Sequence, residues 1–492
     1  MTGKMIVLPG EPNDANRDYL PESIKGSKMV VNENGNNSQV YPERLQEFHG
    51  DLVGDGQEDT WFEYVPENYD PAKKTPLVFS MHGGLMTGWG QCIYTGWTMV
   101  ADREGFIVVF PSAANRRFWQ VECEPERKKE LTTPNASGFW MNPFPDDIKE
   151  NHDANLVLAL IERMKQRYNI DESRLYMQGM SMGNAMTAMM AKYYSHLFAG
   201  MAGSGGTSRT SQFFHPDGTV THCSLPVAAW QTRLELDGPP PFSDESFEDA
   251  VVNNRKYWLI VNECRQAPLI KIVGEKNLAY YRGEKADYVF CDVKNRDHGQ
   301  TLDDAEFVWD YLFSGARRMP DGSIHMTQAE EPFTPNAFSA VLAEGNENAL
   351  LNGERIRLTG KPFYWEKLKY HGLNGGEKVR GRYLMAPVSF LAKAAEAEIK
   401  TWDDGASAEM KLPDGLTVQT ARGSIGAVIN NHLFSMDCEA VQRNGELYMP
   451  AAWFFRMVLG RQVSECHSVL YASDCYGELS MHMARLLRDL TA

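Results

Sequence analysis

The stretch Ser173-Arg-Leu-Tyr-Met-Gln-Gly-Met-Ser181-Met-Gly183 decides the fold. Its first half, Ser173–Gln178, reads as a buried strand, and apolar residues at helical spacing follow from Asn184 to His196. Ser181 therefore stands at a tight turn from strand to helix, and the glycine two residues to either side lets neighbouring chain pass without a Cβ. The five-residue pattern is weak by itself because it arises by chance in many proteins. In this context it predicts a nucleophilic serine whose hydroxyl projects above the sheet edge.

Strand-like and helix-like segments alternate along the chain on both sides of this turn. The predicted strands cover residues 60–65, 76–81, 106–111, 173–178, 198–202, 225–230 and 287–292, and the predicted helices cover 97–104, 155–168, 184–196 and 303–313. Short apolar strands that alternate with amphipathic helices favour a mostly parallel sheet with helices on both faces.

A loop upstream of the serine supplies a candidate anion-binding site. His82-Gly-Gly84 follows directly on the apolar run that ends at Met81. In a serine hydrolase of this type, such a loop donates one backbone N–H to the developing oxyanion, and the residue after the nucleophile donates the other. Gly84 and Met182 are the predicted donors. An ordinary turn with a structural histidine is the alternative interpretation.

A base and an acid follow in the expected chain order. His298 lies on the loop after the last predicted strand and is flanked by a glycine, so it is the predicted base that takes the serine proton. Glu235-Leu-Asp237-Gly follows the strand at 225–230 and offers two carboxylates. We select Asp237, which precedes a Gly-Pro turn, to orient the imidazole. Glu235 is the alternative acid. The other interpretation is that Asp237 and Glu235 are both solvated loop residues without a catalytic role.

These residues resemble a known group of enzymes. The matching pieces are Met81-His-Gly-Gly84, Gly96-Trp97, Glu104-Gly-Phe-Ile-Val-Val-Phe-Pro111, Tyr168-Asn-Ile-Asp-Glu-Ser-Arg-Leu-Tyr176, the turn at Ser181, Glu235-Leu-Asp-Gly238 and His298. Together they are similar to the polyhydroxybutyrate depolymerase and feruloyl esterase branch of the α/β-hydrolases, which implies an α/β-hydrolase fold and an ester substrate. Relatives usually carry Asn or Gly after the serine and a second glycine after the motif, whereas this chain has Met182 and Asn184.

Tryptophans fall in segments that overhang the carboxyl ends of the strands, where ligands bind in such sheets. Trp89 and Trp140 are the predicted substrate contacts, and ordinary packing is the alternative for each. Trp97 is assigned to packing.

The end of the chain carries a weak repeat. Tyr383-Leu-Met-Ala-Pro387 resembles Leu447-Tyr-Met-Pro450, and each proline is placed to open a helix that a strand-like stretch follows, at 398–402 and 462–466. The pattern predicts a separate α+β domain. It resembles the stalk domain first named from the N-terminal region of copper amine oxidases, without implying copper. We expect an extension over 1–55, a hydrolase domain over 56–318, a linker over 319–344 and the stalk-like domain over 345–492.

The composition of the chain restricts the kinds of molecule that it is expected to bind. A net charge of −16 disfavours nucleic acid and anionic membranes. No apolar run reaches the roughly 20 residues that span a bilayer. No signal peptide is visible, so we expect a cytoplasmic protein, or a secreted one if a signal peptide has been removed. Eight cysteines without a Cys-x-x-Cys pair predict mostly reduced thiols, with one or two bridges if the protein is exported. We expect no metal and no cofactor.

Three functions are compatible with the pattern. The first is hydrolysis of a carboxylic ester through an acyl-enzyme, on short-chain, hydroxycinnamoyl, acetyl or polyhydroxyalkanoate-type esters. The second is a serine peptidase of the same fold. The third is a binding protein with an inactive hydrolase domain, which the complete set of Ser181, His298 and an acid disfavours. The C-terminal domain is expected to serve attachment or association.

Overall fold

The computed structural model describes residues 44–136, 138–221, 225–239, 245–327, 329, 332–370 and 377–492. Of the predicted N-terminal extension, residues 1–43 lie outside the described residues, as does Cys223. The seven described cysteines are free thiols. Within these ranges, no helix has both the length and the apolar character to cross a membrane.

The chain forms two compact units that are not contiguous in sequence. Unit 1 holds residues 1–268 and 279–333, and unit 2 holds residues 269–278 and 334–492. Unit 1 carries the segments that the sequence assigns to the hydrolase. Unit 2 therefore takes a ten-residue segment from the middle of the predicted hydrolase range 56–318.

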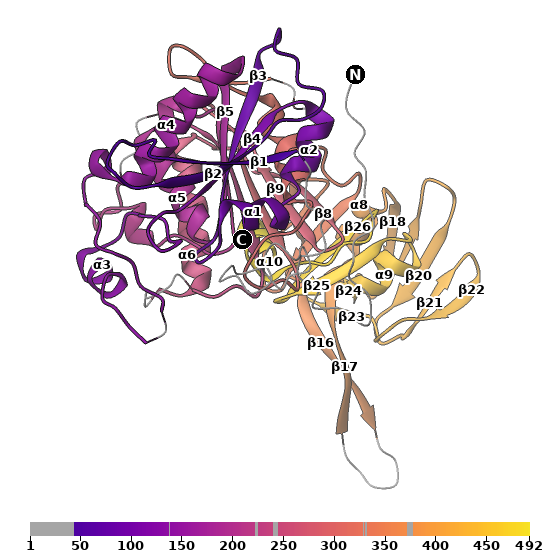
Figure 1. Ribbon diagram of the computed structural model, residues 1–492. Helices are drawn as coiled ribbons and strands as arrows, with labels where there is room; N and C mark the ends of the chain where they lie inside the picture. The colour runs from indigo at the N-terminus through magenta and orange to yellow at the C-terminus, as the bar shows by residue number, and fades with distance from the viewer. Residues whose placement is uncertain are drawn as a thin grey trace, which may run out of the picture. The chain divides into compact units, whose positions relative to one another are not determined.

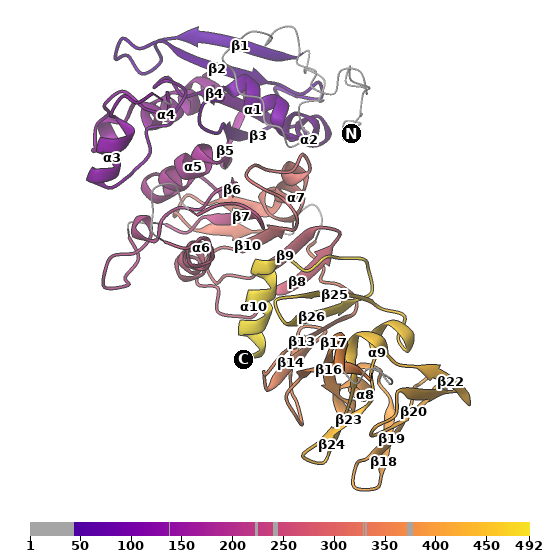
Figure 2. The ribbon, with the colours of Figure 1, turned by 90° about the horizontal axis from the view of Figure 1, so that it is seen from below.

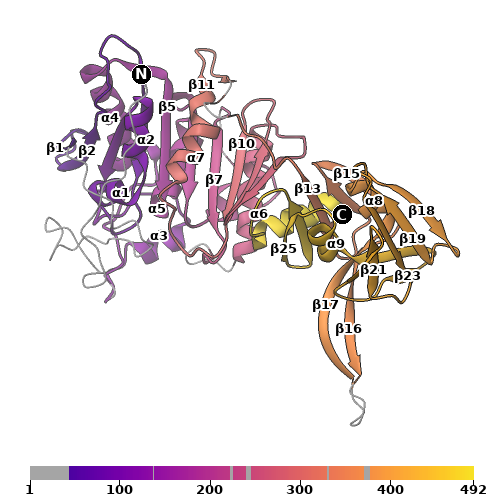
Figure 3. The ribbon, with the colours of Figure 1, turned by 90° about the vertical axis from the view of Figure 1, so that its right-hand side faces the viewer.

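Strand order defines the main sheet. Its ten strands run β1-β2-β4-β3-β5-β6-β7-β10-β9-β8. The bounds are β1 Leu45–Gly50, β2 Asp59–Tyr64, β3 Thr75–Met81, β4 Ile107–Ser112, β5 Ile170–Met180, β6 Gly200–Ser204, β7 Ala228–Leu234, β8 Leu269–Val273, β9 Lys276–Tyr281 and β10 Tyr288–Val293. The strands from β4 through β10 in this order are parallel neighbours, and β1 and β2 are antiparallel additions at one edge (Figure 3). This is the sheet of an α/β-hydrolase.

Helices cover both faces of this sheet. They are α1 Gly88–Tyr94, α2 Trp97–Glu104, α3 Pro125–Leu131, α4 His152–Arg167, α5 Met182–Tyr193, α6 Phe247–Val261 and α7 Asp304–Tyr311, with 3₁₀ turns at Ile148–Glu150, Ser195–Leu197, Thr210–Gln212 and Phe313–Gly315. Strand side chains alternate between faces. On β5, Met177 packs into the core beneath α4 and α5, while Tyr176 stacks on Phe313 at 4.6 Å beside α7. Figure 2 shows α4 and α5 on one side of the sheet and α2 and α7 on the other.

The structure confirms the alternation of strands and helices and differs from the prediction in three places. Strand β7 continues to Leu234, beyond the predicted end at 230, so Glu235 and Asp237 follow the strand directly. Strands β8 and β9 had no prediction; they are short, at five and six residues, and only Gly274 and Glu275 separate them. The range expected to be a linker, 319–344, contains β12 Ile324–Met326, which pairs with β11 Ala316–Arg318, and β13 Ser339–Ala343.

Unit 2 combines three sheets with three helices, as an α+β region. The sheets have the orders β15-β14-β13-β26-β25, β16-β17-β24-β23 and β18-β19-β20-β21-β22. The bounds are β14 Asn348–Leu351, β15 Glu354–Arg357, β16 Phe363–Tyr370, β17 Glu377–Pro387, β18 Glu398–Trp402, β19 Ser407–Lys411, β20 Thr417–Ala421, β21 Gly426–Ile429, β22 His432–Ser435, β23 Val441–Arg443, β24 Glu446–Pro450, β25 Gln462–Cys466, β26 Val469–Ser473, α8 Val388–Ala394, α9 Ala451–Met457 and α10 Met481–Thr491. The hairpin β16–β17 extends away from the rest of the unit (Figure 1).

The repeat predicted for this region has the expected local structure. Pro387 and Pro450 precede α8 and α9 at the N-cap position, where the missing proline N–H costs no helical hydrogen bond. The strands that follow, β18 and β25, have the predicted bounds.

The segment 269–278 is tied to the end of the chain inside unit 2. The Asn277 side chain donates to the Glu478 carbonyl at 2.9 Å and accepts from the Ser480 N–H at 3.1 Å. Gly274 exchanges backbone hydrogen bonds with the stretch 476–478. Because these partners lie about 200 residues downstream, no local pattern predicts that the segment belongs to this unit.

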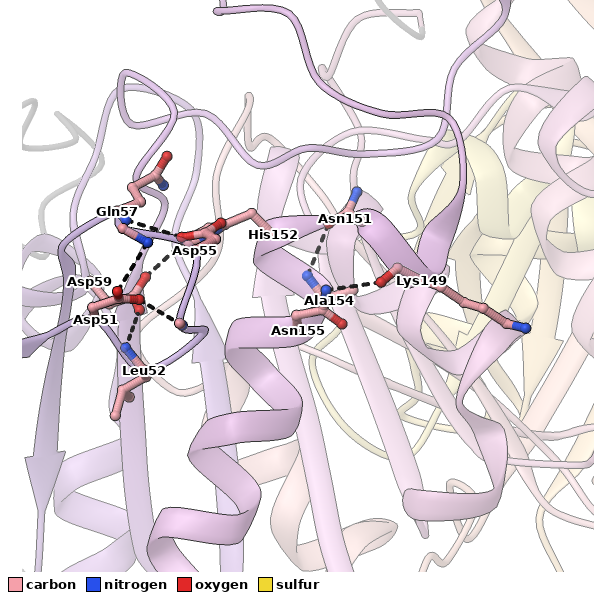
Figure 4. Close-up of polar contacts among 12 residues, drawn as sticks. Asp51, Leu52, Asp55, Gln57, Asp59, Lys149, Asn151, His152, Ala154 and Asn155 are labelled. Carbon is pink, nitrogen blue, oxygen red and sulfur yellow. Dashed lines mark hydrogen bonds and ion pairs between the residues drawn. The ribbon is translucent and has the colours of Figure 1, made fainter.

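A charged contact fixes the start of α4 to the β1–β2 connection (Figure 4). The His152 ring lies between two carboxylates, with Nδ1 2.7 Å from Asp55 and Nε2 2.9 Å from Asp59. The Asp59 carboxylate also accepts from the Leu52 N–H at 2.9 Å. The hydrogen bond to Asp59, with that to Asp55, raises the pKa of His152 to about 9. His152 is therefore a cation at neutral pH.

Candidate active site

Ser181 occupies the turn between β5 and α5 in a strained backbone conformation. Its φ is 56° and its ψ is −116°, outside the regions that non-glycine residues normally adopt. Close approach of the backbone enforces the turn: a Cβ at Gly183 would lie 2.1 Å from the Met81 carbonyl oxygen, and a Cβ at Gly179 would lie 2.1 Å from the Gly183 carbonyl oxygen. Both glycines are thus required by geometry, and the serine hydroxyl is held at the carboxyl end of the strand.

The structure brings Ser181, His298 and Asp237 into one hydrogen-bonded row. The His298 Nε2 lies 2.7 Å from the Ser181 Oγ, and its Nδ1 lies 2.9 Å from the Asp237 Oδ1. Asp237 accepts further hydrogen bonds from the N–H groups of Gly206 and Gly238. Its side chain is almost fully buried, whereas that of His298 is 49% exposed. The carboxylate is fixed and the imidazole faces solvent.

Glu235, the alternative acid, is placed elsewhere. Its carboxylate lies 3.3 Å from the Lys294 Nζ and accepts from the Asn295 N–H at 3.0 Å. These contacts hold the loop after β10 against the end of β7. Of the two carboxylates on this loop, Asp237 is therefore the one that meets the imidazole.

The contact between Asp237 and His298 sets the protonation state of each residue. Burial acts to raise the pKa of Asp237, but the hydrogen bond and charge of His298, with the two backbone N–H groups, lower it overall. The hydrogen bond to Asp237 in turn raises the pKa of His298 against the opposing effect of burial. Asp237 is thus a carboxylate at neutral pH, and the Nδ1 of His298 keeps its proton toward it, which leaves Nε2 as the acceptor for the serine proton.

A buried amide network fixes the loop that carries His298. The Gln178 side chain, three residues before Ser181, donates to the Gln300 Oε1 at 2.8 Å. The Gln178 Oε1 accepts from the Ser80 hydroxyl at 2.7 Å and the Trp97 indole at 3.0 Å. The Gln300 N–H donates to the Tyr94 hydroxyl at 2.9 Å. This network has no signal in the sequence, because nothing local marks Gln178 and Gln300 as partners 122 residues apart.

The predicted oxyanion loop lies beside the serine turn. His82 is fully buried: its Nδ1 is 2.6 Å from the Gly83 carbonyl oxygen, and its Nε2 accepts from the Ala113 N–H at 2.9 Å. Burial lowers the pKa of His82 to about 4, so it stays neutral and shapes the loop. Met182 is the first residue of α5, where a helix leaves N–H groups without an intrahelical acceptor. The Met182 sulfur approaches Gly84 closely.

Asn184 fills a space created by a glycine on the next strand. A Cβ at Gly203 would lie 1.8 Å from the Asn184 Oδ1. The Asn184 amide donates to the Gly206 carbonyl at 3.3 Å, and the Gly206 N–H binds Asp237. Asn184 therefore supports the segment after β6 whose Gly206 N–H binds the carboxylate of Asp237.

The two predicted substrate tryptophans differ in exposure. Trp89 is 6% exposed within α1 and offers little surface to a ligand. Trp140 is half-buried, and the Arg116 guanidinium lies 3.5 Å from its ring centroid. Trp97 is buried and packs, as expected. Across the described ranges, no group of three or more His, Cys, Asp or Glu side chains is placed to hold a metal ion.

Comparisons with known proteins give partial matches. No family model matches the chain. The bifunctional acetylxylan esterase/xylanase of Neocallimastix patriciarum is 29% identical over 164 residues, 32% of this chain and 20% of its own length. Poly(3-hydroxyalkanoate) depolymerase C of Paucimonas lemoignei is 30% identical over 31% of this chain and 34% of its own. Feruloyl esterase B of Neurospora crassa is 30% identical over 29% and 43%.

A solved acetyl xylan esterase from Aspergillus awamori superposes on 54% of this chain and 98% of its own, with 17% identity and a TM-score of 0.39. The chain spans less than half the length of the three sequence relatives. The relatives are esterases and a depolymerase that act on ester bonds, at low identity.

Proposed function

We propose that this protein is a serine hydrolase of carboxylic esters that works through an acyl-enzyme. The observation that carries the proposal is the row of hydrogen bonds from Ser181 through His298 to the buried Asp237. It stands on a strained strand-to-helix turn, the geometry that nucleophilic serines of α/β-hydrolases require. The partial similarity to esterases and a depolymerase points to the same class of bond.

The first half of the reaction forms an ester with the protein. The Ser181 Oγ attacks the substrate carbonyl carbon as its proton passes to the His298 Nε2. The buried Asp237 carboxylate stabilises the imidazolium and takes no proton itself. The negative charge on the carbonyl oxygen is received by the N–H groups of Gly84 and Met182, each worth roughly 3 kcal/mol of barrier. His298 then gives its proton to the leaving alcohol, and the carbon–oxygen bond breaks.

The second half returns the serine. Water attacks the acyl carbon while His298 accepts one of its protons. The carbonyl is re-formed as the bond to the Ser181 Oγ breaks, and the serine recovers its proton from His298. The products are a carboxylic acid and an alcohol, and no step needs a cofactor. The His298 side chain is 49% exposed, so water can reach it for this step.

Labelling by a fluorophosphonate tests the mechanism. We expect the wild type to be labelled at Ser181 and Ser181→Ala to lose the label, while Ser323→Ala, which alters an exposed serine in the same unit, keeps it. A panel of p-nitrophenyl, hydroxycinnamoyl and hydroxybutyrate esters then measures turnover. An unlabelled, folded wild type, or a Ser181→Ala variant that hydrolyses these esters at the wild-type rate, would contradict the proposal.

For the stalk-like C-terminal region, which we place at 345–492, we propose attachment to a surface or association. Exposed apolar side chains support this role, with Trp402 48% and Leu433 78% exposed. Truncation would strip the partners of the segment 269–278, so point substitutions are the cleaner test. Trp402→Ala with Leu433→Ser should lower activity on an insoluble polymeric ester and leave a soluble ester unaffected; equal activity on both substrates would remove the proposed role.

A further inference from the structure

Two loops beside the oxyanion loop are joined residue by residue. Asn115 and Asn142 exchange two hydrogen bonds, at 2.9 and 2.8 Å. The Arg116 guanidinium stacks on the Trp140 ring at 3.5 Å. The Phe118 and Phe139 rings meet edge to face, with their centroids 4.7 Å apart. The segments 113–118 and 138–142 therefore form one unit, which we call the paired loops.

The paired loops pack directly on a predicted oxyanion donor. A Cβ at Gly84 would lie 3.1 Å from the Phe118 ring and 3.6 Å from the Met182 sulfur. The Leu85 N–H also donates to the Arg117 carbonyl at 2.9 Å. The oxyanion loop thus touches the paired loops on one side and the residue after the nucleophile on the other.

Backbone strain gathers at this contact. Leu85, Arg116 and Arg117 have φ values of 65°, 57° and 65°, in the left-handed region that non-glycine residues seldom occupy. Each such residue costs on the order of 1 kcal/mol or more, and strained positions cluster where chains clamp ligands. With Ser181 at 56°, four strained residues surround the same place. The contacts between the paired loops and the oxyanion loop hold these residues in that conformation.

The two phenylalanines have different exposures. Phe118 is 1% exposed and serves as the support, whereas Phe139 is 40% exposed. Of the two rings, Phe139 is the one that leaves surface for a ligand to reach. The exposed Arg116 stacks on Trp140, the residue that follows Phe139 in the chain. The paired loops therefore present one exposed aromatic ring, Phe139, supported by a buried one.

We propose that Phe139, held over the oxyanion loop by the paired loops, is the residue that selects the ester. Its ring receives a flat, apolar group of the substrate, so esters that carry an aromatic ring near the reacting carbonyl are preferred to aliphatic esters. Edge-to-face and stacked rings attract each other beyond the burial of their surface, which an aliphatic group does not match. This inference rests on the proposed ester hydrolysis.

Two matched pairs of esters test the inference. In each pair only one side of the ester changes from aliphatic to aromatic, so an effect can be assigned to the acyl side or to the alcohol side. Ethyl cinnamate against ethyl butyrate varies the acyl side, and phenyl acetate against ethyl acetate varies the alcohol side, with acid release followed by titration. For Phe139→Ala we expect kcat/KM to fall roughly tenfold for the aromatic member of one pair and less than twofold for its aliphatic partner. Phe139→Trp should keep the preference because it restores a flat ring.

Phe144→Ala is the matched control, since Phe144 lies in the same connection but contacts Lys128, with no contact to Phe118. It should leave both ratios unchanged. Labelling of Ser181 by a fluorophosphonate should proceed in every variant. If the label forms but Phe139→Ala leaves both ratios unchanged, or lowers aromatic and aliphatic members equally, the assignment of Phe139 is wrong while ester hydrolysis stands. An unlabelled wild type overturns the proposed function instead.

Discussion

Replacing Asp237 by asparagine tests which of the two acids that follow β7, Asp237 or Glu235, orients the imidazole of His298. The Asp237 carboxylate accepts from His298 and Gly238 on one oxygen and from Gly206 on the other. Asparagine has a single acceptor oxygen. If that oxygen keeps the Gly206 N–H, its NH₂ group faces His298, which then carries its proton on Nε2 and cannot accept from Ser181. If the oxygen instead faces His298, the NH₂ group points at the Gly206 N–H, and two hydrogen-bond donors face each other without an acceptor between them.

The expected magnitude follows from the tautomer. Loss of the orienting carboxylate in a Ser-His-Asp site costs on the order of 10⁴ in kcat. At about 1.4 kcal/mol for each factor of ten, the barrier rises by about 5 kcal/mol. KM should change little, because Asp237 is buried and does not line the face of His298 that meets solvent.

Steady-state hydrolysis of p-nitrophenyl acetate measures the effect, with thermal unfolding as a check on folding. Glu235→Gln is the matched control, since Glu235 contacts Lys294 and Asn295 and not His298. It should keep at least a tenth of the wild-type kcat. The reasoning is refuted if Glu235→Gln loses more than a hundredfold in kcat while Asp237→Asn stays within tenfold of the wild type.

Three further outcomes are expected. Because the pKa of His298 is raised and the base must be neutral, kcat/KM should rise with pH with its midpoint above 6.5, and a midpoint below 6 would contradict the contact with Asp237. Gly183→Ala places a Cβ 2.1 Å from the Met81 carbonyl oxygen, so activity should fall more than a hundredfold and the urea midpoint should drop; near-normal activity would show that the turn relaxes. His152 has its pKa raised to about 9, so its ion pairs contribute fully below pH 6.5 and are lost as pH rises through 9. His152→Gln should therefore lower the unfolding free energy at pH 6 by roughly 2–3 kcal/mol, with a smaller deficit at pH 10 in urea titrations, and a deficit independent of pH would assign the effect to packing.

Local patterns were sufficient for the centre of the site. Ser181 directly follows the buried second half of β5, and His298 lies on the loop after the buried strand β10; both stretches are rich enough in apolar residues to be recognised in the sequence. The choice between Asp237 and Glu235 depends on where β7 ends and which way each side chain leaves the turn. Because Glu235 and Asp237 are only two residues apart, their positions in the sequence do not show which side chain turns toward His298.

Longer-range features needed the structure. No local pattern marks Gln178 and Gln300 as partners, and only the fold brings their amides to 2.8 Å. The Asn184 side chain, on helix α5, fills the space that Gly203 leaves on strand β6, about twenty residues further along the chain. The place of the segment 269–278 in unit 2 has no local signal for the same reason, because its partners are hydrogen-bonding groups of the backbone, which every residue carries.

The segment 269–278 also sets the order in which the protein can be assembled. The Asn277 side chain has partners 201 and 203 residues downstream, at Glu478 and Ser480. At roughly 5–20 residues per second, a ribosome needs roughly 10–40 s to make that intervening chain. During this time the segment cannot reach its native contacts, while earlier parts of the chain are free to fold. The contacts of Asn277 inside unit 2 are therefore completed only after Glu478 and Ser480 have been made, so a chain that terminates before them lacks these contacts however far the stop lies from Ser181.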